Sequence, residues 1–456
     1  MNYRLSKWCH SFKINNDITA LFHSISMSVL YLLSKDFNNL ETEAGIKSLD
    51  KDTFNALVEE KFLVLSNYKE FQELISIRDK LLKDISLEMM YLIVTDGCNL
   101  RCRYCFEETP CFNLPFNPTL MDVKTANASI DLFVKLAHKY GKKNRRKIIH
   151  LYGGEPLLNF EIIKVVTEKL NKIKKYDPLF KDCKLVIITN GTLFNDEIVK
   201  FIIENNIAVG ISIDGPENIN NLYRISKIES FNVFKKSLDF FRLLKEKGAD
   251  VGMSAVLTPE LIKDFNKTLN FFTEELGIES GMSFNILHFN PELVINPQYF
   301  RISAIALIRS FIFFRKLGIY EERMMRKVNS FINREVIYAD CGVVGNQIVI
   351  SPDGKVGVCQ DFIKPRKYFE NSVFNKDYDP FSSGLFNNWK KRSPLFMKKC
   401  HKCEALSICG GGCPASVELK TGDRWNVDER ICQHSKLTLR WLIKDSFNKI
   451  KKSCEV

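Results

Sequence analysis

Strand-like and helix-like hydrophobic patterns alternate through the middle of the chain. Six short apolar runs have the length and composition of buried strands, and several segments between them carry apolar residues three or four positions apart. The six runs cover residues 89–94, 148–151, 185–188, 209–213, 251–257 and 282–287. Six strand-helix units predict an α/β fold whose parallel sheet curls toward a barrel, with functional residues on the loops that follow the strands.

Two of the amphipathic segments show their helical spacing clearly. The first has Ile130, Phe133 and Ala137 on one face, and we expect it to start at residues 117–119 and to stop at Gly141. The second repeats apolar residues at positions 162, 166, 170 and 173. A doubly wound open sheet is the alternative fold, but no Gly-x-Gly-x-x-Gly motif follows the first strand.

The composition is that of a globular protein with a large core. With 456 residues, 45% of them hydrophobic, the chain is long enough for about three domains. No apolar run approaches the roughly 18 residues of a membrane span, and the first residues lack a signal peptide's hydrophobic region, so we expect a cytoplasmic protein. The net charge of +12 is scattered along predicted helices, which favours an acidic peptide over nucleic acid as the partner.

Three cysteines follow the first predicted strand. Cys98, Cys102 and Cys105 are separated by three and two residues, and they supply three thiolates where a closed 4Fe-4S cluster takes four. One iron would then be open to a ligand that is not protein. Fourteen cysteines in a long chain without an export signal favour metal over disulfides. Structural zinc is the alternative, although no second Cys-x-x-Cys hairpin lies nearby.

With Tyr104 as the aromatic residue before its last cysteine, this run resembles the signature of the radical S-adenosylmethionine (SAM) enzymes. The resemblance implies that the open iron binds SAM. Reduction of the cluster then cleaves SAM to methionine and a 5′-deoxyadenosyl radical, which takes a hydrogen atom from the substrate. The resemblance also sharpens the fold to a partial (β/α)6 radical SAM barrel.

The loops after the next strands carry the residues that the resemblance assigns to SAM. The run Gly153-Gly154-Glu155-Pro156 is similar to the motif that holds the methionine amino group: its glycines allow close approach, and the Glu155 carboxylate can accept from an ammonium group. The other assigned residues are Thr189, Asn190, Ser212, Asp214 and Arg224. Many relatives carry His-Asp where this chain has Asn220-Asn221, which leaves the partner of Arg224 open.

Seven cysteines near the C-terminus form a second pattern, which matches the SPASM domain and resembles a carrier of two auxiliary Fe-S clusters. The resemblance assigns Cys400, Cys403, Cys409 and Cys432 to one cluster, and Cys341, Cys359 and Cys413 to the other. The protein would therefore hold three 4Fe-4S clusters. Residues 331–340 contain no cysteine, so one iron of the second set is left open to a substrate thiolate, a water or another residue.

The expected domain boundaries follow from these patterns. Residues 18–32 are apolar and compatible with strands, whereas 50–63 and 67–83 look helical. A winged-helix-like domain fits this order and resembles the leader-recognition element of peptide-modifying enzymes, with a purely structural extension as the alternative. The expected division is a winged-helix-like domain at 1–85, the barrel at 86–320, a SPASM domain at 321–440 and a basic tail at 441–456.

These resemblances predict a maturase of ribosomally made peptides (RiPPs). A precursor peptide, leader plus core, would lose a hydrogen atom, and a thiolate at the open auxiliary iron would attack the carbon to leave a thioether. A carbon-carbon crosslink is the sibling outcome. A flavodoxin- or ferredoxin-like protein would supply electrons. Cys9, Cys111, Cys183 and Cys454 have no assigned role, although Cys183 is expected to be buried before a strand and Cys454 to lie on a disordered tail.

Two other functions stay open. Anaerobic sulfatase-maturing enzymes oxidise a Cys or Ser to formylglycine, and they place a catalytic Asp directly after the equivalent of Cys359. Here Asp361, the candidate base, lies one residue further on, and in a strand this displacement would turn its carboxylate to the opposite face. The second alternative is a non-catalytic Fe-S electron carrier or zinc-scaffolded binding protein, which would need no ligand pocket.

Overall fold

Six parallel strands form the centre of the main sheet in the computed structural model, which describes residues 2–107, 117–279, 281–291, 293 and 295–454. They are β6 (Met89–Thr95), β7 (Ile148–Gly153), β8 (Lys184–Thr189), β9 (Ala208–Ser212), β10 (Val251–Leu257) and β11 (Gly281–Ile286). Each pairs with the next in chain order. The prediction of a curled (β/α)6 sheet is confirmed, because a doubly wound sheet would reverse its order at a switch point.

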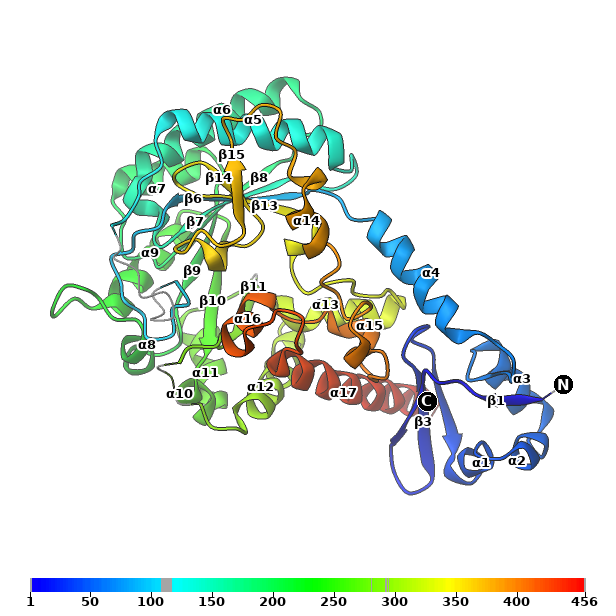
Figure 1. Cartoon of the computed structure of the whole chain (residues 1–456). Helices are drawn as coiled ribbons and strands as arrows, with labels where there is room; N and C mark the ends of the chain where they lie inside the picture. The colour runs from blue at the N-terminus through cyan, green and yellow to red at the C-terminus, as the bar shows by residue number, and fades with distance from the viewer. Residues whose placement is uncertain (1, 108–116, 280, 292, 294, 455–456) are drawn as a thin grey trace.

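Helices between these strands cover the outer face of the sheet (Figure 1). They include α5 (Val123–Tyr140), α6 (Phe160–Tyr176), α7 (Asp196–Glu204), α8 (Glu217–Tyr223) and α9 (Val233–Glu246). The predicted start of α5 at residues 117–119 is wrong. Leu120 instead forms a β-bridge with Thr95, and Asp122 caps the helix by accepting a 2.7 Å hydrogen bond from Thr125 N. The predicted end at Gly141 is confirmed, since Gly141 is the C-cap.

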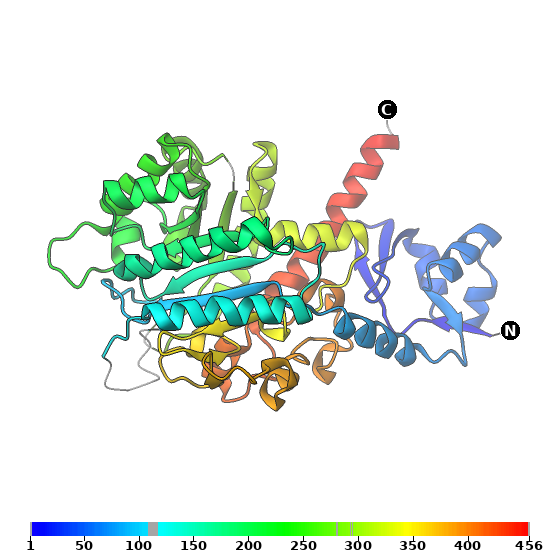
Figure 2. The ribbon, with the colours of Figure 1, turned by 90° about the horizontal axis from the view of Figure 1, so that it is seen from above.

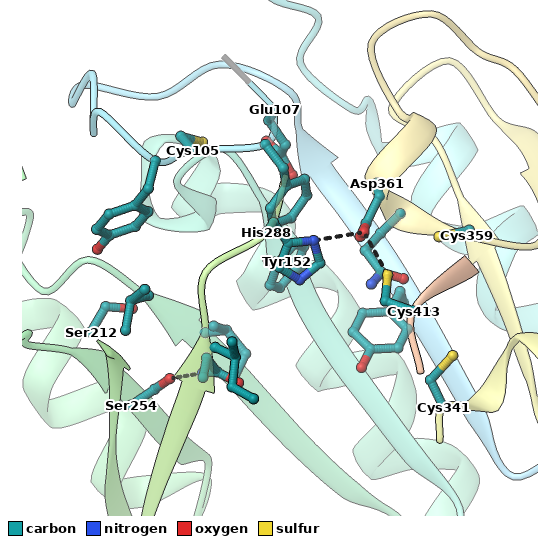
Figure 3. Close-up of a pocket in the computed structure, with 18 of the residues that line it drawn as sticks. Cys105, Glu107, Tyr152, Ser212, Ser254, His288, Cys341, Cys359, Asp361 and Cys413 are labelled. Carbon is teal, nitrogen blue, oxygen red and sulfur yellow. Dashed lines mark hydrogen bonds and ion pairs between the residues drawn. The ribbon is translucent and has the colours of Figure 1, made fainter. Parts of the chain in front are cut away.

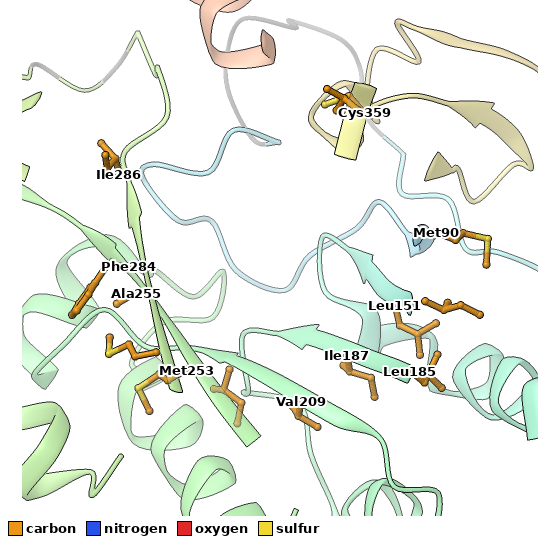
Figure 4. Packing of buried hydrophobic residues seen from close by; sticks show 14 of the residues in the cluster. Met90, Leu151, Leu185, Ile187, Val209, Met253, Ala255, Phe284, Ile286 and Cys359 are labelled. Carbon is orange, nitrogen blue, oxygen red and sulfur yellow. The ribbon is translucent and has the colours of Figure 1, made fainter. Parts of the chain in front are cut away.

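Burial alternates along the barrel strands. In β7, Ile149 and Leu151 are buried, whereas His150 and Tyr152 between them are only partly buried. The buried set packs in one continuous core with residues of neighbouring strands, such as Ile187 (Figure 4). Parallel strands are usually buried on both faces. The alternation therefore indicates that the inner face of this sheet borders a hollow.

The sheet continues beyond the barrel into the C-terminal region. Strand β13 (Gln347–Ile350) pairs in parallel with β6, and β14 (Lys355–Gly357) and β15 (Phe369–Ser372) follow as antiparallel strands. At the opposite edge, β12 (Tyr320–Glu321) pairs with β11. The C-terminal cysteines are thus attached to the first barrel strand by backbone hydrogen bonds, a connection that the hydrophobic pattern did not predict.

The N-terminal residues form a separate unit at one end of the molecule, joined to the barrel by α4 (Glu70–Lys83) (Figures 1 and 2). Its strands are β2 (Cys9–Lys13), β3 (Ile18–His23) and β4 (Val29–Leu33) in one antiparallel sheet, and β1 (Tyr3–Leu5) paired with β5 (Leu63–Leu65). Its helices are α1 (Ser34–Asn39), α2 (Glu43–Lys47) and α3 (Lys51–Glu59). Leu21, Leu57 and Phe62 lie in a core of its own. Its winged-helix character stays a prediction.

The expected disordered tail is wrong, because helix α17 (Glu429–Cys454) continues through the boundary at residue 440. Leu442 and Ile443 are buried, and Tyr31 Oη donates to Ile443 O at 2.7 Å, so this segment bridges the barrel side and the N-terminal unit. The remaining α-helices are α10 (Pro259–Lys263), α11 (Phe265–Asn270), α12 (Tyr299–Lys316), α13 (Glu322–Asn333), α14 (Gly384–Trp389), α15 (Leu406–Cys409) and α16 (Pro414–Thr421). Among the described helices, none has both the length and the apolarity needed to cross a membrane.

Lys147 ties the loop before β7 to the start of the barrel. Its side chain is fully buried, and its Nζ donates to Glu88 Oε2 at 2.5 Å and to the carbonyls of Lys142 and Arg145 at 2.7 Å. We expect Lys147→Ala to lower the free energy of unfolding by about 3 kcal/mol, because Glu88 loses its buried partner. Urea unfolding followed by circular dichroism measures this. Lys143 is exposed in the same loop, and Lys143→Ala should change the free energy of unfolding by less than about 0.5 kcal/mol. Equal effects of the two substitutions would contradict a stabilising role for the Lys147 contacts.

Candidate functional site

A cavity of about 750 Å³ lies where the barrel strands end at their carboxyl ends. The loop after β6 lines one side, and the C-terminal cysteine region lines the other. Figure 3 shows Cys105 on the first side, and Cys341, Cys359 and Cys413 on the second. The cavity is the hollow that the alternating burial of the strands indicates.

The three cysteines of the first motif, Cys98, Cys102 and Cys105, all line this cavity. Cys98 Sγ accepts hydrogen bonds from Leu100 N at 3.4 Å and from Asn190 Nδ2 at 3.9 Å. Burial raises the pKa of the Cys98 thiol to about 12, with Glu155 as the next cause. A metal ligand must be a thiolate, and a cation bound beside Cys98 would lower this pKa.

The cysteine loop is tied to the ends of neighbouring strands. Asn190 Nδ2, just after β8, donates to Asn99 Oδ1 at 2.9 Å, and Asn99 Nδ2 donates to Thr192 Oγ1 at 2.8 Å. Two backbone N–H groups of the loop also donate at the end of α8: Arg101 N to Ile225 O at 2.7 Å, and Arg103 N to Tyr223 O at 2.9 Å. These bonds hold the three thiols over the barrel mouth.

Tyr104 connects the same loop to a buried ion pair. Its hydroxyl donates to Asp214 Oδ2 and accepts from Arg224 Nη1 at 2.7 Å. Burial raises the pKa of Asp214, while Arg224, 3.8 Å away, opposes the rise. Tyr104 and Arg224 line the cavity, but Asp214 lies behind them. Asn220 supports the set, since Asp214 N donates to its Oδ1 at 3.0 Å.

The Gly-Gly-Glu-Pro run packs against the cysteine loop. Gly154 N donates to Thr95 O, and Glu155 N donates to Gly97 O. A Cβ on Gly154 would lie 2.3 Å from Gly97 O, so only glycine allows this approach. Gly153 and Gly154 line the cavity, whereas Glu155 and Pro156 do not.

The Glu155 carboxylate is fully buried and accepts three hydrogen bonds from the protein. The donors are Leu157 N at 3.1 Å, Thr189 Oγ1 at 2.7 Å and Asn190 N at 2.8 Å. Burial raises its pKa. The contacts describe a brace between β7 and β8, so direct binding of an ammonium group by Glu155 stays a prediction. Thr189, Asn190 and Ser212 line the cavity, as a ligand-binding role requires.

Cys341, Cys359 and Cys413 line the opposite side of the cavity. Cys413 N donates to Asp428 Oδ2 at 2.9 Å. Gly412 before it has φ of 74°, and a Cβ there would lie 2.5 Å from Asp428 Cβ, so the turn requires glycine. Burial raises the pKa of Cys359 well above its usual value, and the neighbouring Asp361, Cys413 and Cys341 raise it further.

The other four C-terminal cysteines gather away from the cavity. Burial raises the pKa of Cys400 to about 11, with Cys409 and Cys432 as the next causes. Burial also raises the pKa of Cys403 to about 12, and Cys409 adds to the rise. None of the four lines the cavity. The two sets of cysteines that the resemblance separated are thus separate in space, while their metal binding stays a prediction.

Asp361 faces the cavity, so the argument that its displacement turns it away is wrong. Residues Gln360–Phe362 form the 3₁₀ turn η5 rather than a strand, and the two-residue alternation of strands does not apply. Cys413 Sγ donates to Asp361 Oδ2 at 3.7 Å, and His288 Nδ1 lies 3.7 Å from the same oxygen. Burial raises the pKa of Asp361 to about 6.

His288 is a cavity residue that sequence reasoning missed. It follows β11, and its ring lies 5.3 Å from the ring of Phe106, next to Cys105. Burial and then Arg430 lower its pKa to about 3, so the ring is neutral. The available signal was its place after the last predicted barrel strand, where functional residues are expected.

Three of the four unassigned cysteines are within the described residues, and neither Cys9 nor Cys183 lines the cavity. Cys183 is buried just before β8, as predicted, and Cys9 lies in β2 of the N-terminal unit. Cys454 ends helix α17. Cys111 lies outside the described residues.

Comparison with known protein families decides the class of site. Residues 92–272, which contain the three-cysteine loop and strands β6 to β10 almost entirely, match the Radical SAM superfamily. Residues 92–272 thus form a radical SAM domain, and the protein is an enzyme. It uses SAM and a 4Fe-4S cluster, and the donor set fits them: three thiols beside a cavity that also presents glycine backbone and the Arg224 guanidinium.

Relatives and a solved structure extend this similarity beyond the matched domain. The radical SAM cyclopropyl synthase TigE of Paramaledivibacter caminithermalis is 24% identical over 97% of this chain and 96% of its own. A cysteine-type anaerobic sulfatase-maturating enzyme of Clostridium novyi is 26% identical over 73% and 89%. The structure of Streptococcus suis SuiB bound to its precursor peptide SuiA covers 94% of this chain and 100% of its own, with a TM-score of 0.54 and 16% identity. The last likeness shows the fold.

Glu155→Gln tests the brace beneath the SAM site. A glutamine cannot accept all three hydrogen bonds, because its amide nitrogen must face an N–H or O–H donor, at a cost of about 1–3 kcal/mol. We expect SAM to bind about tenfold more weakly, measured by equilibrium dialysis. Glu161 is exposed on α6, and Glu161→Gln should leave the affinity for SAM unchanged. Unchanged affinity in both variants would show that the brace does not shape the site.

Proposed function

We propose that this radical SAM enzyme modifies a ribosomally made precursor peptide by removing two hydrogens and joining two of its atoms. The observation that carries the proposal is the shared cavity: one hollow is lined by Cys98, Cys102 and Cys105 on one side, and by Cys341, Cys359 and Cys413 on the other. A peptide side chain in this cavity lies between both sets of cysteines.

In this proposal, each residue that lines or supports the cavity has a separate role in binding the cluster or SAM. Cys98, Cys102 and Cys105 hold the 4Fe-4S cluster that binds SAM, and this cofactor pair, when bound, supplies a 5′-deoxyadenosyl radical. Gly153 and Gly154 offer backbone to SAM. Thr189, Asn190 and Ser212 line its nucleoside part, and Arg224 pairs with its carboxylate. Tyr104 and Asp214 keep Arg224 in place, and Glu155 braces the floor.

The C-terminal cysteines hold two further 4Fe-4S clusters in this proposal. Formation of the new bond removes from the peptide one hydrogen atom, one proton and one electron. The hydrogen atom would end in 5′-deoxyadenosine, and the clusters that Cys341, Cys359 and Cys413 and the set at Cys400 would hold could accept the electron. A flavodoxin- or ferredoxin-like protein exchanges electrons with the enzyme. The N-terminal unit binds the leader of the peptide.

The type of new bond is a thioether or a carbon-carbon bond. The relative that matches nearly all of both chains is named a cyclopropyl synthase, and a cyclopropyl ring closes by a carbon-carbon bond. This name supports the carbon-carbon outcome. A second candidate function is oxidation of a sulfatase residue to formylglycine, because Asp361 faces the cavity and a sulfatase-maturating enzyme is among the relatives.

Cys98→Ala tests the radical step. We expect the wild-type enzyme, purified anaerobically, to contain about 12 irons and the variant about 8. The variant should form no 5′-deoxyadenosine from SAM under reductant, because one cluster ligand is lost. Cys9→Ala, in the N-terminal unit, should keep both iron and activity. Zinc with little iron in the wild-type protein would contradict the enzyme assignment.

Co-expression with a small open reading frame encoded beside the gene tests the peptide substrate. We expect a loss of 2 Da for each new bond by mass spectrometry, because two hydrogens leave. Alkylation with iodoacetamide separates the outcomes: a thioether removes a cysteine from labelling, whereas a carbon-carbon bond leaves all cysteines reactive. A formylglycine product in a neighbouring sulfatase, with no change in the peptide, would support the second candidate.

A further inference from the structure

A buried carboxylate stands among the three cysteines on the far side of the cavity. Asp361 is 4% exposed, and the turn η5 places it two residues after Cys359. Its Oδ2 lies 3.7 Å from Cys413 Sγ. In Figure 3 it points into the same space as Cys413, between Cys359 and His288. Four potential metal donors of this chain, one oxygen and three sulfurs, thus line one side of one cavity.

Among the described residues, no cation lies at hydrogen-bond distance from this carboxylate, and the Cys413 thiol donates to it at 3.7 Å. His288 Nδ1 is 3.7 Å away, which is too long for a hydrogen bond. Arg430 also lines the cavity, but its Nε and Nη2 donate to Asp428 at 2.9 and 2.8 Å, and its Nη1 donates to Leu287 O at 2.8 Å. A buried carboxylate with a weak thiol donor and no cation in contact is costly. A positive centre between the carboxylate and the thiols would offset this cost.

We propose that Asp361 is the fourth protein ligand of the cluster held by Cys341, Cys359 and Cys413. The inference rests on the proposed function only in assuming that this cluster is present. Three thiolates satisfy three of four irons, and the carboxylate oxygen satisfies the fourth. The alternation of side chains along a β-strand does not oppose this role, because η5 is a 3₁₀ turn in which Asp361 lies beside Cys413.

His288 is the competing ligand, since its ring nitrogen, Asp361 and Cys413 all lie within 4.8 Å of one another. The two candidates differ in what their burial costs. A neutral imidazole can be buried facing a cavity at little cost, whereas a carboxylate that lacks a full set of donors is stabilised by a cation beside it. His288 also comes from the barrel side, after β11, whereas Asp361 shares a turn with Cys359. The geometry therefore assigns the ligand role to Asp361.

Ligation by Asp361 has a chemical consequence. A cluster with four protein ligands has no iron open to a substrate thiolate, unless that thiolate displaces the carboxylate. The cluster then serves to carry an electron away from the peptide. This outcome favours the carbon-carbon bond over the thioether.

Cyanide binding tests the assignment without any turnover. The background is Cys98→Ala/Cys102→Ala/Cys105→Ala, which lacks the SAM-binding cluster and its open iron. The protein is reconstituted with iron and sulfide, reduced, mixed with ¹³C-cyanide and examined by electron-nuclear double resonance. With Asp361 intact we expect no ¹³C coupling. Asp361→Ala should show the ¹³C coupling, because the iron that Asp361 ligates is then open to cyanide. Asp361→Cys should keep about 8 irons and show no ¹³C coupling.

Matched variants sharpen the result. Asp353→Ala, a nearby carboxylate paired with Arg366, should stay silent. If Asp361→Ala loses about four irons while Asp361→Cys retains them, ligation is also supported. A ¹³C coupling with Asp361 intact, loss of iron in Asp361→Cys, or a ¹⁵N-histidine coupling that disappears in His288→Ala would overturn the assignment. Fewer than about 8 irons in the background itself would instead reject the auxiliary cluster, and with it that part of the proposed function.

Discussion

The parallel pairing of β13 with β6 is the contact on which the site depends. Residues 347–350 lie in register with residues 89–92, so the C-terminal cysteine region begins beside the strand that leads into the first cysteine loop. A shift of one residue would turn every side chain of β13 to the other face. The pairing thus determines that Cys341 and Cys359, before and after the β13–β14 hairpin, face the same cavity as Cys98.

Buried carboxylates complete the site, and each is compensated by different neighbouring groups. Asp214 has the Arg224 guanidinium and the Tyr104 hydroxyl, so its charge is compensated within the protein. Glu155 has no cation at hydrogen-bond distance among the described residues, but three donors satisfy it. Asp361 has no guanidinium at hydrogen-bond distance among the described residues, and the Cys413 thiol donates to it at 3.7 Å. The proposed ligand role of Asp361 rests on this contrast.

The sequence predicted the parts of the fold that local patterns determine. Six strands, the end of α5 at Gly141 and the burial of Cys183 follow from hydrophobic runs and turn residues, which act over a few positions. The pairing of β13 with β6 joins residues more than 250 positions apart, and no local pattern encodes it. The course of α17 was missed for the same reason, since its middle part contacts Tyr31 in the N-terminal unit, which lies more than 400 positions away in the sequence.

The candidate site shows the same division. Spacing places the cysteines in sets, because metal ligands follow short fixed intervals, but it does not give the conformation of the residues between them. The expectation for Asp361 assumed strand alternation, but the backbone instead forms a 3₁₀ turn, and Asp361 Oδ2 lies 3.7 Å from Cys413 Sγ. His288 carries no motif at all. Its place in the cavity depends on where β11 ends relative to the cysteine loop, which only the assembled barrel determines.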